Sequence, residues 1–271
     1  MTQHAQSSDR RELSHLLVAS YGRSGSTAVQ SLIGALPGYC IRGENYNVLG
    51  HLAAGARAAQ ITSLKFGSKP TLPDNPWYGA ENIDPKAFAR SICEAFVESV
   101  LQPPADCRVV GFKEIRLFQD VANAYDDLQF FCDYFSRPRI VFVQRSWEQV
   151  AASGWWVGAL KDDVKRYVES CNEVMETFHA THPELSFIVQ HSSFTLGNSH
   201  IEDLFSFLGE RPEPELVESV LSKRLVHGHK AALAARSGRM SRQQMFGGTE
   251  AELAQRKWKL GPLSVSLRWS K

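Results

Sequence analysis

Short apolar runs alternate along the chain with longer segments whose pattern is typical of helices. The runs with the length and apolar content of buried strands are 15–20, 108–112, 139–143 and 185–190. Several of the longer segments carry a helix signal at one end, such as a proline in the first turn. The predicted helices are 27–36, 46–60, 85–101, 146–156, 162–181 and 201–208. The alternation predicts an α/β fold with a central parallel sheet flanked by helices.

The chain is long enough for one such domain, which we expect to span residues 1–271. It is 43% hydrophobic and shows no internal repeat. Residues 1–13 are polar and predict an N-terminal tail, and the segment 64–84 predicts a long surface loop. The segment 227–248 is rich in glycine, serine, arginine and glutamine, which predicts a flexible segment or lid.

Charge and cysteine content restrict the classes of function. Lysine and arginine total 30 and aspartate and glutamate total 29, so the chain lacks the basic excess that favours binding to nucleic acid or an anionic membrane. Any anion-binding site must therefore be local. The five cysteines are widely spaced, with no CxxC pair and no histidine at metal-ligand spacing, which predicts reduced thiols and no metal site. The chain shows no signal peptide and no apolar stretch for stable membrane insertion, so we expect a cytoplasmic enzyme.

The most informative segment runs from Leu17 to Thr27, where an apolar strand passes through a glycine-bearing turn into a helix. Gly22 and Gly25 let the backbone turn tightly and approach an anion, and the first N–H groups of the helix point toward it. The side chains that add further donors are Arg23, Ser24, Ser26 and Thr27. The segment predicts a phosphate-binding loop, and an ordinary strand-to-helix turn is the alternative.

A nucleoside triphosphatase loop of the form G-x-x-x-x-G-K-[ST] fits this segment less well. If Gly25 is the second glycine, Ser20 stands in place of the first glycine and Ser26 in place of the lysine. Such enzymes also need a carboxylate at a neighbouring strand end to hold Mg²⁺. Here the predicted neighbouring strands end at the cationic residues Lys113 and Arg145. These cationic residues suit an anionic donor that binds without a metal better than they suit Mg-ATP.

The segment 21–27 resembles the 5′-phosphosulfate loop of sulfotransferases that use 3′-phosphoadenosine 5′-phosphosulfate (PAPS), in the G-R-S-G-S-T form of their carbohydrate and bacterial branches. Residues 141–153 resemble the family's 3′-phosphate-binding segment, where Arg145 and Ser153 have the family's spacing. The resemblance covers residues 15–195 in scattered blocks. It implies a P-loop-like domain that binds PAPS and releases 3′-phosphoadenosine 5′-phosphate (PAP), without a metal.

The same resemblance suggests a general base. In the carbohydrate-type and bacterial members a glutamate after the first helix commonly serves as base, and Glu44 resembles it. The chemistry needs such a group, because an acceptor hydroxyl becomes a competent nucleophile only as its proton leaves. A solvated loop carboxylate is the alternative for Glu44. His51, on the following predicted helix, is the reserve candidate.

Three charged residues, Lys113, Glu114 and Arg116, follow the predicted strand at 108–112. Ligands of open α/β sheets lie at the carboxyl ends of strands, so Lys113 and Arg116 are expected near the sulfuryl group or the acceptor. Glu114 is either a second acid–base candidate or a partner of these cations. A structural ion pair is the alternative to any functional role.

Together these features predict a sulfotransferase that transfers a sulfuryl group from PAPS to a hydroxyl or amine of a carbohydrate, lipid or small-molecule acceptor. The predicted catalytic residues are Glu44, Arg23, Lys113 and His51. The residues predicted to bind PAPS are Gly22, Arg23, Ser24, Gly25, Ser26, Thr27, Arg145 and Ser153. Two other functions stay open, a P-loop small-molecule kinase that uses Mg-ATP and a nucleotide-binding module without catalysis. The sequence indicates neither the acceptor nor the oligomeric state.

Overall fold

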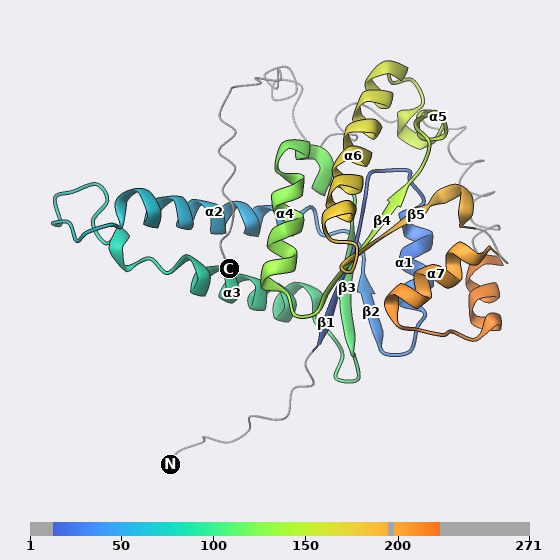
Figure 1. Cartoon of the computed structure of the whole chain (residues 1–271), viewed down its shortest axis with the longest axis horizontal. Coiled ribbons are helices and arrows are strands. Elements are labelled where there is room, and N and C mark those ends of the chain that lie inside the picture. The colour runs from blue at the N-terminus through green and yellow to red at the C-terminus, as the bar shows by residue number, and fades with distance from the viewer. Residues whose placement is uncertain (1–12, 195–197, 223–271) are drawn as a thin grey trace, which may run out of the picture. The chain divides into compact units, whose positions relative to one another are not determined.

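A five-stranded parallel sheet forms the centre of the protein (Figure 1). The computed structural model describes residues 13–194 and 198–222. The strands are β1 (Ser14–Ser20), β2 (Tyr39–Arg42), β3 (Val109–Glu114), β4 (Pro138–Gln144) and β5 (Ser186–Gln190). Their order in the sheet is β2-β3-β1-β4-β5. The predicted α/β class is confirmed.

Helices connect the strands and supply the two apolar layers that cover the sheet. They are α1 (Ser26–Gly34), α2 (Val48–Phe66), α3 (Pro85–Phe96), α4 (Val121–Tyr134), α5 (Trp147–Ala151), α6 (Lys161–Thr181) and α7 (Ser199–Leu208). A π-helical turn, Val97–Leu101, continues α3, and residues 214–222 are helical as well. Short 3₁₀ turns lie at Ala80–Asn82, Leu117–Asp120, Gly154–Trp156 and His191–Ser193.

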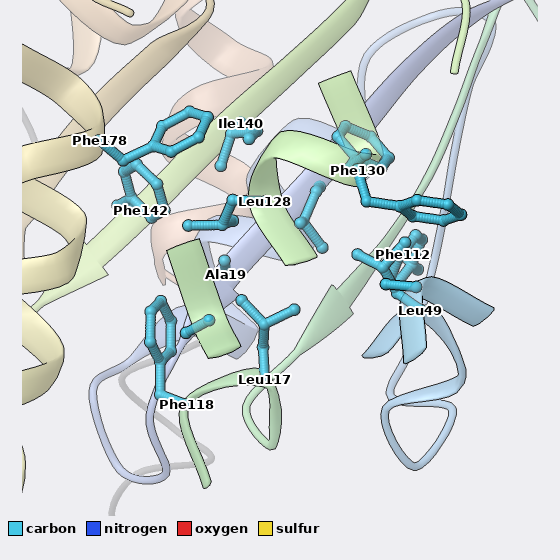
Figure 2. Close-up of a cluster of buried hydrophobic side chains, with 14 of the residues drawn as sticks. Ala19, Leu49, Phe112, Leu117, Phe118, Leu128, Phe130, Ile140, Phe142 and Phe178 are labelled. Atoms are coloured by element: carbon cyan, nitrogen blue, oxygen red, sulfur yellow. The ribbon is translucent and has the colours of Figure 1, made fainter. Parts of the chain in front are cut away.

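Alternate residues of β1 face the two layers, as the period of a strand requires. Leu17 and Ala19 lie in a large core cluster with side chains of α2, α3, α4 and α6. Leu16 and Val18 lie in a second cluster with side chains of α1 and α7. Figure 2 shows part of the first cluster, in which phenylalanine rings pack among aliphatic side chains. Burial on both faces explains why these strands read as continuous apolar runs.

The parallel arrangement brings all five carboxyl ends of the strands to one edge of the sheet. In the register, Val18 of β1 pairs with Lys113 of β3, and Ser20 of β1 pairs with Val143 of β4. Neighbouring strands lie about 5 Å apart, so the residues that follow β3, β1 and β4 are close in space. The sequence motifs named above meet at this edge.

Several predicted elements differ from those observed. The edge strand β2 was not predicted, because it is only four residues long and half-buried. Helix α4 was not predicted, and it buries Asp127 on its apolar face. The helix predicted at 146–156 is wrong as a continuous element: α5 ends at Ala151, and Gly154 has a φ of 58°, which breaks the helix. Helix α2 continues to Phe66, into the segment predicted as a loop.

Two predicted segments lie outside the described residues, the N-terminal tail up to residue 12 and the lid at 227–248. Within the part of the chain that the structure describes, no helix has both the length and the apolar content needed to cross a membrane.

Candidate active site

The loop between β1 and α1 has the backbone geometry of an anion cradle. Arg23 and Gly25 adopt left-handed conformations, with φ of 71° and 95°. They turn the chain sharply into α1, whose first turn begins with a bond of 3.0 Å from the Ala28 N–H to the Gly25 carbonyl. The N–H groups at the start of a helix lack intrahelical acceptors and carry the positive end of the helix dipole. The cradle can therefore bind a phosphate or a sulfate group.

The predicted donors of the cradle differ in exposure. The side chains of Arg23 and Thr27 are exposed, whereas Ser24 and Ser26 are buried. The Ser24 hydroxyl accepts a hydrogen bond of 3.3 Å from the Ser26 N–H, so Ser24 stabilises the turn itself. Any ligand therefore meets Arg23, Thr27 and backbone groups before it meets these two serines.

The loop that follows α5 packs directly on the cradle. A Cβ atom on Gly22 would collide with the indole of Trp155, so this position requires glycine for close approach. The Trp156 Nε1–H donates to the Gly22 carbonyl at 3.3 Å. The Arg23 guanidinium lies 5.6 Å from the centre of the Trp155 ring, a cation–π distance. Both tryptophans therefore help to shape the cradle, a role that the sequence did not assign to them.

Arg145 follows β4 and lies against the cradle. Its Nη1 donates to the Arg23 carbonyl at 3.0 Å and its Nε donates to Gln149 Oε1 at 3.0 Å. Its backbone is held by the buried Tyr21, whose hydroxyl donates to the Arg145 carbonyl and accepts from the Arg145 N–H, both at 2.8 Å. Burial raises the pKa of Tyr21 to about 12, so the hydroxyl keeps its proton at neutral pH. Sequence reasoning missed this clamp, although Tyr21 directly precedes the cradle glycine.

Ser153 reaches the same loop from the other side. Its hydroxyl accepts a hydrogen bond of 3.1 Å from Arg23 Nε. On a continuous helix, eight residues would place Ser153 about 12 Å along the axis from Arg145. Helix α5 ends at Ala151, so Ser153 leaves the helical path, and its hydroxyl contacts the side chain of Arg23, whose backbone carbonyl accepts from Arg145. Arg145 and Ser153 therefore both contact Arg23.

Glu44 follows β2 and lies between two cations. Its carboxylate accepts hydrogen bonds of 2.5 Å from Lys113 Nζ and from Arg116 Nη1. The Glu44 side chain is 28% exposed and the Lys113 side chain only 7% exposed. Burial tends to raise the pKa of Glu44, but the hydrogen bonds and charges of Lys113 and Arg116 outweigh burial and lower this pKa below its ordinary value. Glu44 is therefore a carboxylate at neutral pH.

Glu114 differs from Glu44 in exposure and in partners. It is fully buried, and its two oxygens accept hydrogen bonds from four backbone N–H groups of the adjacent loops, those of Asn45, Asn47, Ile115 and Arg116. A weaker ion pair of 3.7 Å joins it to Arg116 Nη1. These bonds and its burial leave Glu114 poorly placed to exchange a proton with a substrate. The other expectation for Glu114, a partner of the cations Lys113 and Arg116, is met by the ion pair with Arg116, and its closest partners are backbone N–H groups.

His51 lies in the first turn of α2, and its side chain is exposed. Its backbone N–H donates to the Asn47 carbonyl at 3.3 Å. Since the Asn47 N–H binds Glu114, the start of α2 is fixed to the end of β3. His51 thus lies one turn of helix from the loop that carries Glu44.

The donors at this edge of the sheet are guanidinium, ammonium, hydroxyl and backbone N–H groups, which fit the phosphates of a nucleotide. Nowhere in residues 13–194 and 198–222 do three histidine, cysteine, aspartate or glutamate side chains gather as metal ligands.

No protein-family model and no curated protein sequence matches this chain. Among solved structures, a sulfotransferase domain from the olefin synthase of Synechococcus PCC 7002 is 16% identical, with 78% of each chain covered and a TM-score of 0.47. A sulfotransferase from Alicyclobacillus acidocaldarius is 12% identical, with 76% of this chain and 89% of that chain covered and a TM-score of 0.41. Deoxyadenosine kinase from M. mycoides, with bound dATP, is 13% identical, with 73% of this chain and 100% of that chain covered and a TM-score of 0.35. These likenesses are too distant to assign a function, which must come from the site.

Proposed function

We propose that the protein is a sulfotransferase that moves a sulfuryl group from PAPS to a hydroxyl or amine of a carbohydrate, lipid or small-molecule acceptor. The supporting observation is the convergence of two groups at one sheet edge. Arg23, Arg145 and Ser153 meet at the anion cradle. On the neighbouring strands, Glu44 lies between Lys113 and Arg116. The first group suits an anionic donor, and the second suits deprotonation of an acceptor.

In this proposal the cradle binds the 5′ end of the donor. PAPS, when bound, supplies a sulfuryl group linked to its 5′-phosphate through an oxygen. Arg23 and the N-terminal N–H groups of α1 stabilise the negative charge that builds on this oxygen as the sulfur–oxygen bond breaks. Arginine does not give up its proton at neutral pH, so Arg23 acts by charge and hydrogen bonding alone.

Arg145 and Ser153 bind the 3′-phosphate in this proposal. Arg145 now bonds the Arg23 carbonyl and Gln149, and Ser153 accepts from Arg23. A phosphate between them can accept from both side chains, and the planar guanidinium can offer it two parallel N–H groups. The Tyr21 clamp keeps the Arg145 backbone in place as its side chain changes partner.

Glu44 accepts the proton of the acceptor group in this proposal. The acceptor oxygen or nitrogen bonds to sulfur, the bond from sulfur to the phosphate oxygen breaks, and the acceptor proton passes to the Glu44 carboxylate. Each carboxylate oxygen has two acceptor positions, so Glu44 can bind the acceptor while it stays paired with Lys113 and Arg116. A lowered pKa makes Glu44 a weaker base, and its contribution is expected at the low end of the range for general-base catalysis, about 10²-fold.

The state of the thiols supports a proposal about the cellular setting. All five cysteines are free, and three of them are buried. We propose a cytoplasmic enzyme, since reducing compartments keep such thiols unpaired.

Calorimetry with PAP in excess chelator tests the proposal. We expect binding in the micromolar range or tighter without metal, because two phosphate groups meet two arginines and a helix N-terminus. Slow hydrolysis of radiolabelled PAPS, with water as the acceptor, then tests catalysis without knowledge of the natural acceptor. Tight binding of Mg-ATP together with failure to bind PAP would instead establish the kinase function. PAP binding without PAPS turnover on any acceptor, including water, would indicate a binding module.

A further inference from the structure

Glu114 is a fully buried carboxylate whose hydrogen-bond partners belong to two separate chain segments. Oε2 accepts from the N–H groups of Asn45 and Asn47, at 3.2 and 2.8 Å. Oε1 accepts from the N–H groups of Ile115 and Arg116, both at 2.9 Å. One side chain therefore ties the loop after β2 to the turn after β3.

The loop after β2 has a conformation that needs such a tie. Tyr46 and Asn47 are consecutive non-glycine residues with φ of 63° and 59°, in the left-handed region. This region is unfavourable for a bulky side chain such as that of Tyr46, so the surrounding structure must hold it there. Glu114 binds the N–H groups on either side of Tyr46, and the Asn47 side chain adds a cap bond of 3.4 Å to the Gly50 N–H.

The two segments tied by Glu114 carry all three members of the charged group described above. Glu44 immediately precedes Asn45, Lys113 immediately precedes Glu114, and Arg116 is itself a partner of Glu114. The Arg116 guanidinium also lies 4.9 Å from the centre of the exposed Tyr46 ring. Displacement of either segment would separate Glu44 from its cations.

We propose that Glu114 is a positioning residue, which holds Glu44 between Lys113 and Arg116 through four backbone hydrogen bonds and does not itself exchange a proton with the substrate. The catalytic consequences rest on the proposed sulfuryl transfer, whereas the structural tie can be tested by itself.

A second buried carboxylate shows what a purely structural role looks like. Asp127 of α4 is also buried, but it pairs with the side chain of Arg57 on α2, at 2.7 Å. Its partner is a charged side chain within the helical layer. The partners of Glu114 are backbone groups of the loops that form the candidate active site.

The variants Glu114→Gln and Glu114→Asp test the proposal. Glutamine keeps the size but presents an amide N–H₂ to two of the four backbone donors, so the tie breaks at one segment. Aspartate keeps both acceptor oxygens on a shorter side chain, which should restore part of the tie. We expect Glu114→Gln to lower the rate of PAPS hydrolysis by about tenfold or more, Glu114→Asp to recover part of it, and PAP affinity to change less than about twofold in both.

The pH profile distinguishes positioning from simple loss of stability. When Glu44 loses contact with Lys113 and Arg116, the charged groups that face it, its pKa rises toward the ordinary value. The acidic limb of the hydrolysis profile should therefore move to higher pH in Glu114→Gln. A variant that is only less stable would keep the limb where it is in the natural protein. Glu210→Gln is the matched control, since Glu210 pairs with Arg108 at the opposite end of the sheet and should leave both rate and profile unchanged.

Amide hydrogen exchange tests the tie without any activity. Glu114→Gln should increase the exchange rates of one pair of tied amides, either Asn45 and Asn47 or Ile115 and Arg116, while amides of β1 keep their protection. Unchanged protection of all four amides would overturn the positioning role, as would a rate and a pH profile equal to those of the natural protein in a folded Glu114→Gln protein. If Glu114→Gln fails to fold, the same measurements on Glu114→Asp decide. Failure of the natural protein to bind PAP would overturn the proposed function alone, because the exchange result stands independently of it.

Discussion

The two halves of the candidate active site are held in place by different forces. The cradle half, built on β1 and β4, is fixed by backbone geometry and by neutral donors such as Tyr21 and Trp156. The acceptor half, built on β2 and β3, is fixed by the charged residues Glu44, Lys113 and Glu114. The cradle should therefore keep its shape over a wide pH range. The acceptor half carries the proposed general base and none of the proposed nucleotide contacts, so substitutions there should change turnover far more than nucleotide affinity.

Glu44→Gln gives the largest effect expected. The amide cannot take a proton from the acceptor at neutral pH, so PAPS hydrolysis should fall by about 10²-fold or more. PAP affinity should stay nearly unchanged, because Glu44 belongs to the acceptor half. The measurements are a radiolabel hydrolysis assay and calorimetry, with the melting temperature as a check on folding. Turnover by Glu44→Gln close to that of the natural protein would contradict this role and make His51 the candidate general base.

Arg145→Ala should act in the opposite way. Loss of a charge-assisted hydrogen bond to a phosphate costs about 1.5–3 kcal/mol, so PAP affinity should fall by about 10- to 100-fold. Adenosine 5′-phosphosulfate, which lacks the 3′-phosphate, should lose much less affinity in calorimetry. Arg166→Ala, on the exposed face of α6, is the control for lost positive charge. Equal losses for both nucleotides would remove the 3′-phosphate role from Arg145.

Tyr21→Phe should have a moderate effect on the cradle half. The substitution leaves the Arg145 N–H without its partner at 2.8 Å, which costs about 1–3 kcal/mol of the free energy of unfolding. The melting temperature should drop by several degrees, and PAP should bind a few-fold more weakly as Arg145 moves. Tyr125→Phe removes a hydroxyl that lies 3.0 Å from Thr181 Oγ1, away from the cradle, and is the matched control. A drop in turnover larger than the drop in PAP affinity would contradict the division into two halves.

Ser153→Ala is the smallest change. The hydroxyl accepts one exposed hydrogen bond from Arg23, so its removal should barely alter the melting temperature. If it also donates to the 3′-phosphate, PAP affinity should fall by about 3- to 10-fold, the usual size of a single hydrogen bond. Discrimination between PAP and adenosine 5′-phosphosulfate should fall in parallel. If Ser153→Ala discriminates between the two nucleotides as well as the natural protein does, Ser153 does not bind the 3′-phosphate and only orients Arg23.

The parts of the fold set by long apolar runs could be predicted from the sequence, and those set by pairing between distant residues could not. The strands at Ser14–Ser20 and Pro138–Gln144 are buried on both faces, so their apolar runs were evident. The strand Tyr39–Arg42 lies at the sheet edge and has only four residues, too few to show the pattern of a strand. The Tyr21 clamp joins residues 124 positions apart, and no local pattern encodes such a contact.

The candidate site shows the same limit. Glycine positions and charged residues at strand ends indicated the cradle and the cationic residues, because these signals are local. The meeting of Glu44 with Lys113 depends on β2 pairing with β3, which was not foreseen once β2 had been missed. The distinct surroundings of Glu44 and Glu114 could not be read from two glutamates that both follow apolar segments. The roles of all these residues remain predictions.

The order of the strands has a consequence for how such a site can change over time. The connection from β1 to β2 runs through α1, which packs on one face of the sheet. The connection from β3 to β4 runs through α4, which packs on the other face and passes over β1. In open α/β sheets, ligands bind at the carboxyl ends of strands where the connections leave on opposite faces, and the end of β1 lies at such a point. The location of the candidate anion site is thus set by the connectivity of the strands. Side chains that follow the strands can then differ without moving the site, so the same backbone can hold a different donor or acceptor.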